Sequence, residues 1–474
     1  MTIAWPKIVV VEDVPDQFYS YMVVNYVFYV SLMIGSDSIA TISCVDEKGN
    51  KEEVYRQEFI EPPGYCSIND IGAIVAPYVS QGKYDFTLNI EASNLRAERK
   101  FRAEYMVPRL VLKEEFPVFT FSSALDHITF FMQGTRQSYS AQFNLYHGAE
   151  IILSEIYVPD VNNEITIRDL SSLVNPDLQE KLLGDFQIEI KVLNVEDSGV
   201  IASSNIYFTA LYCRADVDMT AEDFIGNFFL STLMGAKVTA PGQKEYLHFV
   251  TTDEDFVSGD ENKLVPVRAY ADYVNSEMKK TSNVFEWNVP INAAEMQIMT
   301  VDVSPLNFVE KGMTLVAYKV VVGSRTQMFS VSQRFDSEPD IAFKNSFGLF
   351  ETLYFTGTKE DAPELSRSAT YVNGEYRNYH VEENRIVKAN TGVIPETMVC
   401  LVDELARSTE AYLIEKGEIG RQITVTESEL KRTNELDALF NFQITYRLAK
   451  RNQNILKVDR PVRTFDSTFD KTFE

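Results

Sequence analysis

The densest group of potential metal ligands in the sequence is the acidic stretch TTDEDFVSGDENK, residues 251–263. Carboxylates are hard oxygen ligands of the kind that bind Ca²⁺. The spacing does not match an EF-hand, because Val257 and Ser258 stand where further ligands and the turn glycine belong. We therefore interpret the stretch as a solvated loop and predict no metal site in the chain. The acids concerned are Asp253, Glu254, Asp255, Asp260 and Glu261.

Sequence motifs of catalysis or cofactor binding are missing from the chain. It contains no GxSxG elbow, no phosphate-binding loop, no GxGxxG and no kinase signature. Asp126 and His127 are adjacent, and neighbouring residues of a strand point to opposite faces, so we interpret His127 as an ordinary strand residue. We predict that the protein is not an enzyme and has no cofactor. A carboxylate pair for glycan cleavage stays open, because 69 acidic residues make chance pairs unavoidable.

The cysteines and histidines are scattered and form no CxxC, HExxH or other ligand set. We predict that the cysteines are small buried hydrophobic residues in a reducing compartment. The residues are Cys44, Cys66, Cys213, Cys400, His127, His147, His248 and His380.

The last residues, TFDSTFDKTFE, place three phenylalanines at a spacing of four: Phe465, Phe469 and Phe473. In an extended chain this spacing keeps all three on one side, which suits strand addition to a neighbour's sheet edge. On a helix they would form a stripe that can enter a groove. We favour the extended form, since Thr and Phe prefer strands, and predict that these three residues bind a partner.

The bulk composition limits both the architecture and the partners. A length of 474 residues predicts three to four domains, and the abundance of Tyr and Phe favours strands. A formal net charge of −25 argues against nucleic acid and anionic lipid as partners. The longest apolar stretch, residues 21–35, is too short to span a membrane, and the first residues do not form a signal peptide. We expect synthesis in the cytoplasm without export.

A repeat of about a hundred residues organises the first two thirds of the chain. Residues 69–92 and 168–192 both contain Asp followed by Ile or Leu (Asp70, Asp169). A short helical stretch with Pro follows, and then a D-F-x-[LI]-x-I strand. Residues 289–335 form a looser third copy. Short alternating strands with one helix per unit predict tandem Ig-like sandwiches.

The fold class we predict is mostly β, with tandem Ig-like β-sandwich domains that each contain a short helix. A C-terminal β-rich α+β domain and an extended C-terminal tail complete it. The predicted segments are residues 1–110, 111–216, 217–338, 339–460 and 461–474.

The fourth segment differs from the repeats in its signals. Asn373-Gly374 is the strongest hairpin dipeptide of the chain. Nearby tyrosines could stack on sugars, but we favour their facing each other across this hairpin. Gly348 is predicted to supply the positive φ of a second turn, and the stretch after Pro395 is predicted to form an amphipathic helix followed by strands. The tyrosines are Tyr371, Tyr376 and Tyr379, and the apolar helix positions are Leu401 and Leu405.

Three stretches of the last 135 residues or so carry a family resemblance: FKNSFGLFETLYFTGT, the run from RSTEAYLIEKG to RNQNIL, and FDSTFDKTFE. They resemble the C-terminal part of virion proteins of tailed phages and prophages of gut Bacteroidetes. The resemblance implies a tail or tail-associated structural subunit of a virion. It implies contacts with other copies, as a homo-oligomer, and with neighbouring virion proteins. The alternative function is a carbohydrate-binding or adhesive β-sandwich protein.

Overall fold

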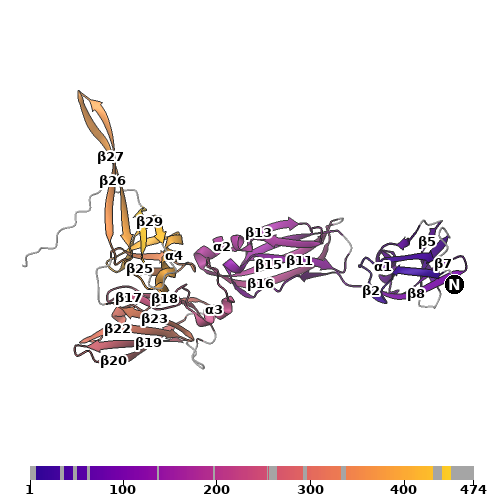
Figure 1. The fold of residues 1–474 in the computed structure, drawn as a ribbon, viewed down its shortest axis with the longest axis horizontal. Coiled ribbons are helices and arrows are strands. Elements are labelled where there is room, and N and C mark those ends of the chain that lie inside the picture. Colours follow the sequence, from indigo (N-terminus) through magenta and orange to yellow (C-terminus); the bar gives the residue numbers. More distant parts are fainter. Residues whose placement is uncertain are drawn as a thin grey trace, which may run out of the picture. The chain divides into compact units, whose positions relative to one another are not determined.

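The computed structural model describes residues 7–31, 37–45, 51–60, 64–135, 138–195, 198–252, 255, 264–291, 296–332, 338–430 and 440–449. Most of these residues lie in strands, as Figure 1 shows. The chain divides into two compact units: residues 1–117, 126–170 and 186–207 form one, and residues 118–125, 171–185 and 208–474 form the other. The five segments expected from the sequence are a finer division, which stays a prediction.

The first repeat builds a five-stranded and a three-stranded sheet. The larger has the order β2-β8-β7-β4-β5 and the smaller the order β1-β3-β6. Helix α1 (Ile71–Val79) stands between β6 and β7 in the chain. The strands are β1 (Lys7–Glu12), β2 (Gln17–Tyr19), β3 (Tyr26–Ser31), β4 (Ser38–Val45), β5 (Lys51–Phe59), β6 (Cys66–Ile68), β7 (Asp85–Ala92) and β8 (Leu95–Glu104).

The second repeat has the same arrangement, with the orders β10-β16-β15-β12-β13 and β14-β11-β9. Helix α2 (Leu170–Lys181) precedes β15, and a 3-10 turn, η1 (Ser122–Ala124), follows β10. The strands are β9 (Arg109–Leu112), β10 (Phe119–Phe121), β11 (His127–Gln133), β12 (Tyr139–His147), β13 (Glu150–Tyr157), β14 (Glu164–Arg168), β15 (Leu183–Asn194) and β16 (Val200–Leu211).

The third repeat keeps the five-stranded sheet, with the order β17-β23-β22-β19-β20, beside a two-stranded sheet of β18 and β21. Helix α3 (Ala221–Asn227) precedes β17, and the stretch before β22 is only a 3-10 turn, η3 (Pro305–Phe308). The strands are β17 (Lys237–Thr239), β18 (Tyr246–Val250), β19 (Leu264–Asn275), β20 (Lys280–Pro290), β21 (Ile298–Asp302), β22 (Met313–Val322) and β23 (Arg325–Val331).

The three five-stranded sheets share one topology. In each, a three-residue strand pairs in parallel with the last strand of the repeat, as β2 pairs with β8, β10 with β16 and β17 with β23. The other described strand pairs of these sheets are antiparallel. This order corresponds to the G-F-C sheet of an immunoglobulin-like sandwich, with one strand added at each side. The expectation of Ig-like sandwiches is confirmed.

One backbone hydrogen bond recurs in all three repeats. In the first two repeats the amide of the first helical residue donates to a carbonyl just before the second strand of the smaller sheet. In the third repeat the donor lies two residues before the 3-10 turn, and the acceptor lies just before β18. The pairs are Ile71 N to Val24 O at 2.7 Å, Leu170 N to Asp126 O at 3.1 Å, and Val303 N to Glu245 O at 2.9 Å. The three donor residues are buried. The sequence repeat is therefore a repeat of structure.

The two aspartates that mark the sequence repeat play the same backbone role. Asp70 and Asp169 have φ of +52° and +58°, a left-handed conformation that Asp tolerates better than most residues. The Asp70 side chain caps α1 by accepting from Ala73 N at 3.3 Å. After each helix, β7 and β15 bury every second residue, which forms one wall of a core.

The C-terminal segment forms one antiparallel sheet of seven strands, with the order β25-β24-β28-β29-β30-β27-β26. Helix α4 (Val399–Arg407), which follows the 3-10 turn η4 (Glu396–Met398), packs on its core. Leu401 and Leu405 are fully buried, as predicted. The strands are β24 (Asp340–Lys344), β25 (Phe350–Tyr354), β26 (Lys359–Val372), β27 (Glu375–Asn390), β28 (Ala411–Glu415), β29 (Glu418–Leu430) and β30 (Phe442–Leu448).

Candidate functional site: the exposed β26–β27 arm

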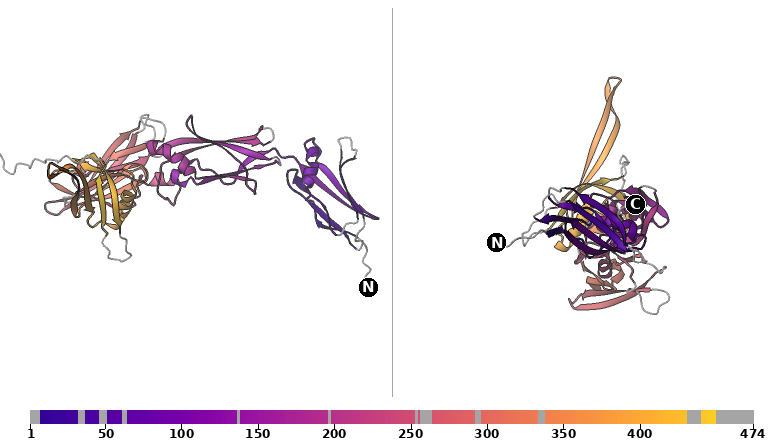
Figure 2. Two further views of the ribbon diagram at one scale, coloured as in Figure 1. Left: turned by 90° about the horizontal axis from the view of Figure 1, so that it is seen from above. Right: turned by 90° about the vertical axis from the view of Figure 1, so that its right-hand side faces the viewer.

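The hairpin of β26 and β27 extends beyond the rest of its sheet (Figures 1 and 2). Strand β30 pairs with β27 only from Asn390 to Ile386. From there to the turn, residues 363–385 form a two-stranded ladder, which we call the arm. The turn is Asn373-Gly374, with φ of +52° and +88°, the two positive values that a tight hairpin turn requires. The predicted hairpin is confirmed.

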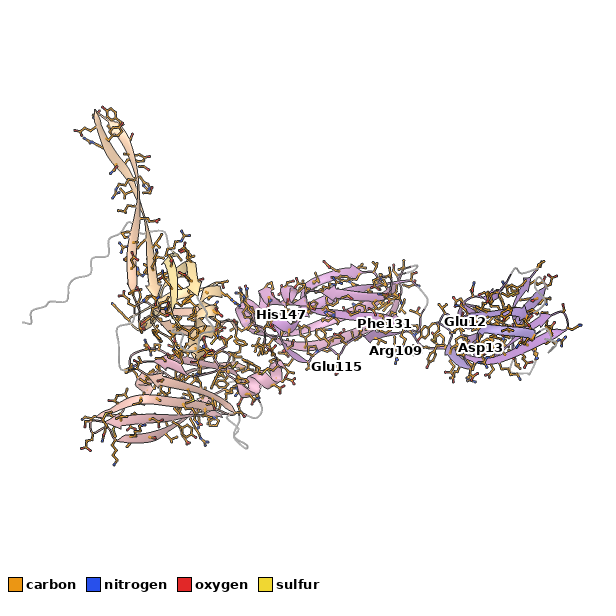
Figure 3. All side chains as sticks on the ribbon, viewed as in Figure 1. Glu12, Asp13, Arg109, Glu115, Phe131 and His147 are labelled. Carbon is orange, nitrogen blue, oxygen red and sulfur yellow. The ribbon has the colours of Figure 1, made fainter. Side chains whose placement is uncertain are left out.

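Nearly every described side chain of the arm is exposed, on both faces. Directly opposite residues of a ladder share a face. One face, which we call the aromatic face, carries most of the apolar side chains, although Val372 lies on the other face, and Figure 3 shows the side chains along both strands. The opposite face, which we call the polar face, is mostly hydroxyl and charged. The aromatic face comprises Leu365, Arg367, Ala369, Tyr371, Tyr376, Asn378 and Val381, and the polar face includes Glu364, Ser366, Ser368, Thr370, Glu375 and Arg377.

The tip of the arm presents three tyrosines. Tyr371 and Tyr376 are 62% and 80% exposed, and their rings meet edge to face with centroids 5.0 Å apart. This confirms that these two face each other across the hairpin. Tyr379 is 70% exposed and lies at an irregularity in the ladder, between the pairs Ser368–His380 and Ala369–Asn378. A tyrosine that is this exposed offers a large amphipathic contact surface.

The edges of the arm are open to strand addition. Strand β26 is last in the order of its sheet, and among the described residues nothing pairs with its outer edge. The outer edge of β27 is likewise unpaired beyond Ile386 in the described part of the chain. Proteins usually blunt such edges with short strands, prolines or covering loops. Here the only proline, Pro363, lies at the base, and residues 364–372 leave a long unprotected edge.

Ion pairs and a buried tyrosine hold the base of the arm. Lys359 contacts Glu338, and Arg385 lies 3.4 Å from Asp361 across the ladder. Tyr446 of β30 is buried beneath, and burial together with nearby acids raises its pKa. Farther out, the described ion pair is Arg377 with Glu375 at 3.3 Å, which is exposed. Exposed pairs contribute little stability, so the outer arm depends mainly on its own ladder.

A buried ion pair lies where the sequence predicted a solvated loop. Asp255 of the acidic stretch accepts from Arg325 at 2.6 and 3.1 Å, and Arg325 also donates to the carbonyls of Ile225 and Val250. Both charged side chains are buried. The expectation of a solvated loop is wrong for Asp255, because an arginine distant in sequence folds over it. Residues 253–254 and 256–263 lie outside the described residues.

Two buried carboxyl groups form a second polar cluster near α4. Burial, followed by the charge of Glu404, raises the pKa of Glu351 to about 8, and burial also raises that of Glu404. Each has one oxygen, Oε2, without a hydrogen-bond partner. Glu404 and Cys400 also line a cavity of about 550 Å³. Burial raises the pKa of the Cys400 thiol to about 11, which is unfavourable for a nucleophile at neutral pH.

The remaining predicted positions have mixed outcomes. Phe465, Phe469 and Phe473 lie outside the described residues, so their partner-binding role stays a prediction. Asp126 and His127 do not point to opposite faces: His127 Nδ1 lies 2.9 Å from Asp126 Oδ2, because β11 begins at His127 and strand alternation does not include Asp126. The burial of cysteines is confirmed for all but one, since Cys400 is only half-buried.

The described residues give two further findings. They contain no group of three or more His, Cys, Asp or Glu side chains that could hold a metal ion. Within the same ranges, no helix is both long and apolar enough to cross a membrane.

The sequence predicted the turn of the arm, but it did not predict that the hairpin extends beyond the rest of its sheet. The available signal was the pattern of residues 359–372, where charged and hydroxyl residues occupy both faces of the strand. Neither face of this strand is apolar along its whole length, so the strand is not suited to cover a core. The pair Arg325–Asp255 joins residues 70 positions apart in sequence and carries no such local signal.

Comparison with known proteins leaves the family open. No family model and no curated protein matches the chain. A crystal structure of a tetra-tandem repeat in the extending region of a large adhesion protein is 10% identical. The match covers 81% of this chain and 94% of that one, with a TM-score of 0.21. A marsupial T cell receptor is 7% identical, with 70% of this chain and 100% of that chain covered and a TM-score of 0.17. On its own sheet topology, this chain is a mostly β protein with repeated Ig-like β-sandwich sheets.

Proposed function

We propose that this protein is a structural subunit of a bacteriophage virion, in a tail or tail-associated position, that acts through protein–protein interfaces. The observation that carries the interface role is the arm, residues 363–385, which is exposed on both faces and open at its edges. The phage assignment is supported by the resemblance of the C-terminal residues to virion proteins. Other copies of the chain and neighbouring virion proteins are the partners, and the virion is the location.

Two strands without a covering layer are only marginally stable in water. The arm nevertheless keeps three exposed tyrosines, Leu365 and Val381, which invite association. A partner that covered the aromatic face would remove this apolar area from water and contribute on the order of several kcal/mol. Such a surface is typical of a subunit whose role depends on its contacts.

The test is to shorten the arm and follow assembly. Ala362 and Ile386 are directly paired, so joining them through Asn-Gly replaces the arm with a two-residue turn and leaves the sheet intact. Light scattering and negative-stain imaging across a concentration series should show discrete oligomers for the native chain and monomers for the shortened chain. Equal unfolding temperatures would establish that the shortened chain is folded.

A matched control keeps the arm and changes only one face. Replacing Tyr371 and Tyr376 by Ser should weaken assembly, whereas replacing Ser366 and Thr370 of the polar face by Ala should change it little. A native chain that remains monomeric at every concentration would contradict the self-assembly part of the proposal. Unchanged oligomers of the shortened chain would contradict the role of the arm.

A second candidate function, glycan binding or adhesion, is favoured by the exposed tyrosines of the tip. Their rings could stack on sugar faces, as aromatic side chains commonly do in ligand sites. Binding of the native monomer to a panel of soluble glycans, lost in Tyr376→Ala and Tyr379→Ala, would support this function. Retained binding in both variants would remove the tip from it.

A further inference from the structure

We propose that the outer edge of β26 in the arm receives residues 464–474 of another copy of this chain as an added strand. The inference rests on the proposed function, since it names the occupant of the interface through which the copies assemble. It requires that the outer edge of β26 is unpaired, that the faces of the arm match those of residues 464–474, and that the path of the chain after β30 favours another copy over the same chain.

The receiving edge is long and regular. Residues 364–372 of β26 pair with β27 on one side, while the outer side is unpaired in the described structure. This stretch contains no proline, so every second residue can offer both its N–H and its C=O to an added strand. Its length, roughly 30 Å at about 3.3 Å per residue, accommodates a strand of nine residues, which is the length of the stretch from Phe465 to Phe473.

The two faces of the arm match the two faces of the terminal segment. In an extended chain, Phe465, Phe469 and Phe473 share one face, and Asp466, Asp470 and Glu474 share the other. An added strand would place the phenylalanines beside the apolar side chains of the aromatic face. The acids would then lie on the polar face, beside Ser366, Ser368 and Thr370, where they keep contact with water.

The direction of β30 favours another copy over the chain's own arm. Its pairing from Asn390–Gln443 to Ile386–Arg447 means that β30 runs toward the tip of the arm. About 16 residues separate Leu448 from Thr464, a span of up to roughly 50 Å in extended form. The arm has about a dozen residues between Ile386 and its turn, so a chain that kept this direction would pass the tip before Thr464. Residues 464–474 could reach their own β26 only after a reversal.

The first experiment measures binding of a labelled peptide of residues 464–474 by fluorescence anisotropy. The receptor is the chain that ends at residue 463, so that its own terminal segment does not compete. We expect saturable binding that weakens by about tenfold or more for a Phe469→Asp peptide, which corresponds to about 1.4 kcal/mol. The matched control, Thr468→Asp, adds the same charge to the opposite face and should stay within about threefold.

The receptor side has its own pair of variants. Leu365→Asp, on the aromatic face of β26, should weaken binding of the native peptide by about tenfold or more. Ile419→Asp, at an exposed apolar residue of β29 in the same sheet, should leave binding within about threefold. No binding of the native peptide, or equal binding to both variants, would overturn the proposal.

A cross-linking experiment separates another copy from the chain's own segment. Leu365→Cys is placed in one tagged chain and Phe469→Cys in a chain with a second tag, and the two are mixed under mild oxidation. A disulfide between the differently tagged chains is the expected result. A chain that carries both Leu365→Cys and Phe469→Cys serves as the second test. If its disulfide forms only within one chain at every concentration, the assignment to another copy is overturned.

The result is distinguishable from failure of the proposed function. Discrete oligomers that persist after deletion of residues 464–474, together with no peptide binding, would overturn the occupant and leave the assembly role standing. Dependence of the oligomers on the arm but not on this segment would favour arm-to-arm pairing instead. A chain that never assembles, but binds the peptide at the arm, would retain the docking site and remove the self-assembled subunit.

Discussion

Two hairpins of similar length within the same compact unit have opposite relations to water. Strands β19 and β20 pair over residues 264–290, and β26 and β27 pair over residues 359–389. In β19 the odd-numbered side of the strand is buried, with Val265, Val267, Ala269 and Ala271 fully covered. In β26 the described pattern is exposed almost throughout. Hairpin length is thus independent of burial.

The difference follows from the residues on each face. Strand β19 alternates small and branched apolar residues with charged ones, so one face can enter a core, and β22 pairs with its other edge. Strand β26 has Lys, Glu, Asp and Ser on both faces near its base, and its outer edge is unpaired in the described structure. A hairpin of the second kind gains little from its own chain, and its apolar residues are available to a partner.

The largest expected effect on stability comes from placing an aspartate in each of the two hairpins. Val267→Asp buries a carboxylate in the core beside β22 and should destabilise this part of the chain by about 4 kcal/mol or more. Leu365→Asp, in the arm, should change stability by less than about 0.5 kcal/mol, because the new charge stays in water. Thermal unfolding followed by circular dichroism measures both. Similar losses of unfolding free energy in the two variants would contradict the difference in burial between the two hairpins.

Removing a buried ion pair should cost more stability than removing an exposed ion pair of the arm. Asp255→Ala leaves the fully buried Arg325 without its carboxylate, which should cost about 3–5 kcal/mol. Glu375→Ala removes the exposed partner of Arg377 in the arm and should cost about 0–1 kcal/mol. Urea unfolding of both variants gives the two values. A small effect of Asp255→Ala would mean that Arg325 can reach water or another acid.

The buried acid Glu351 predicts a specific pH dependence. Its pKa is raised by burial from an ordinary value near 4.5 to about 8, so the folded chain holds a proton that the unfolded chain has released. Its contribution to stability is complete below about pH 4.5 and is lost as pH rises toward 8. Glu351→Gln should therefore be about 1–3 kcal/mol more stable than the native chain at pH 8.5, and nearly equal at pH 4.5.

The measurement is the difference in unfolding free energy between Glu351→Gln and the native chain across this pH range. Taking the difference removes the acids that both chains share. The exposed arm offers a control that removes no titratable group, since Ser366→Ala should give a difference that is flat with pH. A flat difference for Glu351→Gln would show that this carboxyl is ionised in the folded chain.

The smallest effect concerns the turn of the arm. Gly374 has φ of +88° and open space around it, so Gly374→Ala should cost only about 1 kcal/mol of backbone strain, confined to the arm. Gly323, in the β22–β23 turn, has φ of +58°, and a Cβ there would lie 2.6 Å from Asp255 Oδ1, so Gly323→Ala should cost more. Amide hydrogen exchange distinguishes the two, because only the second should loosen strands beyond its own hairpin.

Local patterns in the sequence were sufficient to predict much of the fold. Asn373-Gly374 and Gly348 form the predicted turns, and the strands at Asp85 and Asp185 follow their helices as expected. The third repeat was the loosest in sequence. It differs in structure where Pro305 opens a turn of four residues instead of an α-helix.

The sequence by itself determined the strands, the turns and the repeat, because period-two alternation, Asn-Gly and the aspartate before each of the first two helices act over a few residues. Tertiary structure alone decided that Arg325 covers Asp255 and that Glu351 and Glu404 are buried close to each other, since these contacts join residues distant in the chain. It also decided that β27 extends beyond the end of its pairing with β30, which leaves the arm uncovered. Which strand stops first depends on pairing between strands, and no single stretch of sequence contains that information.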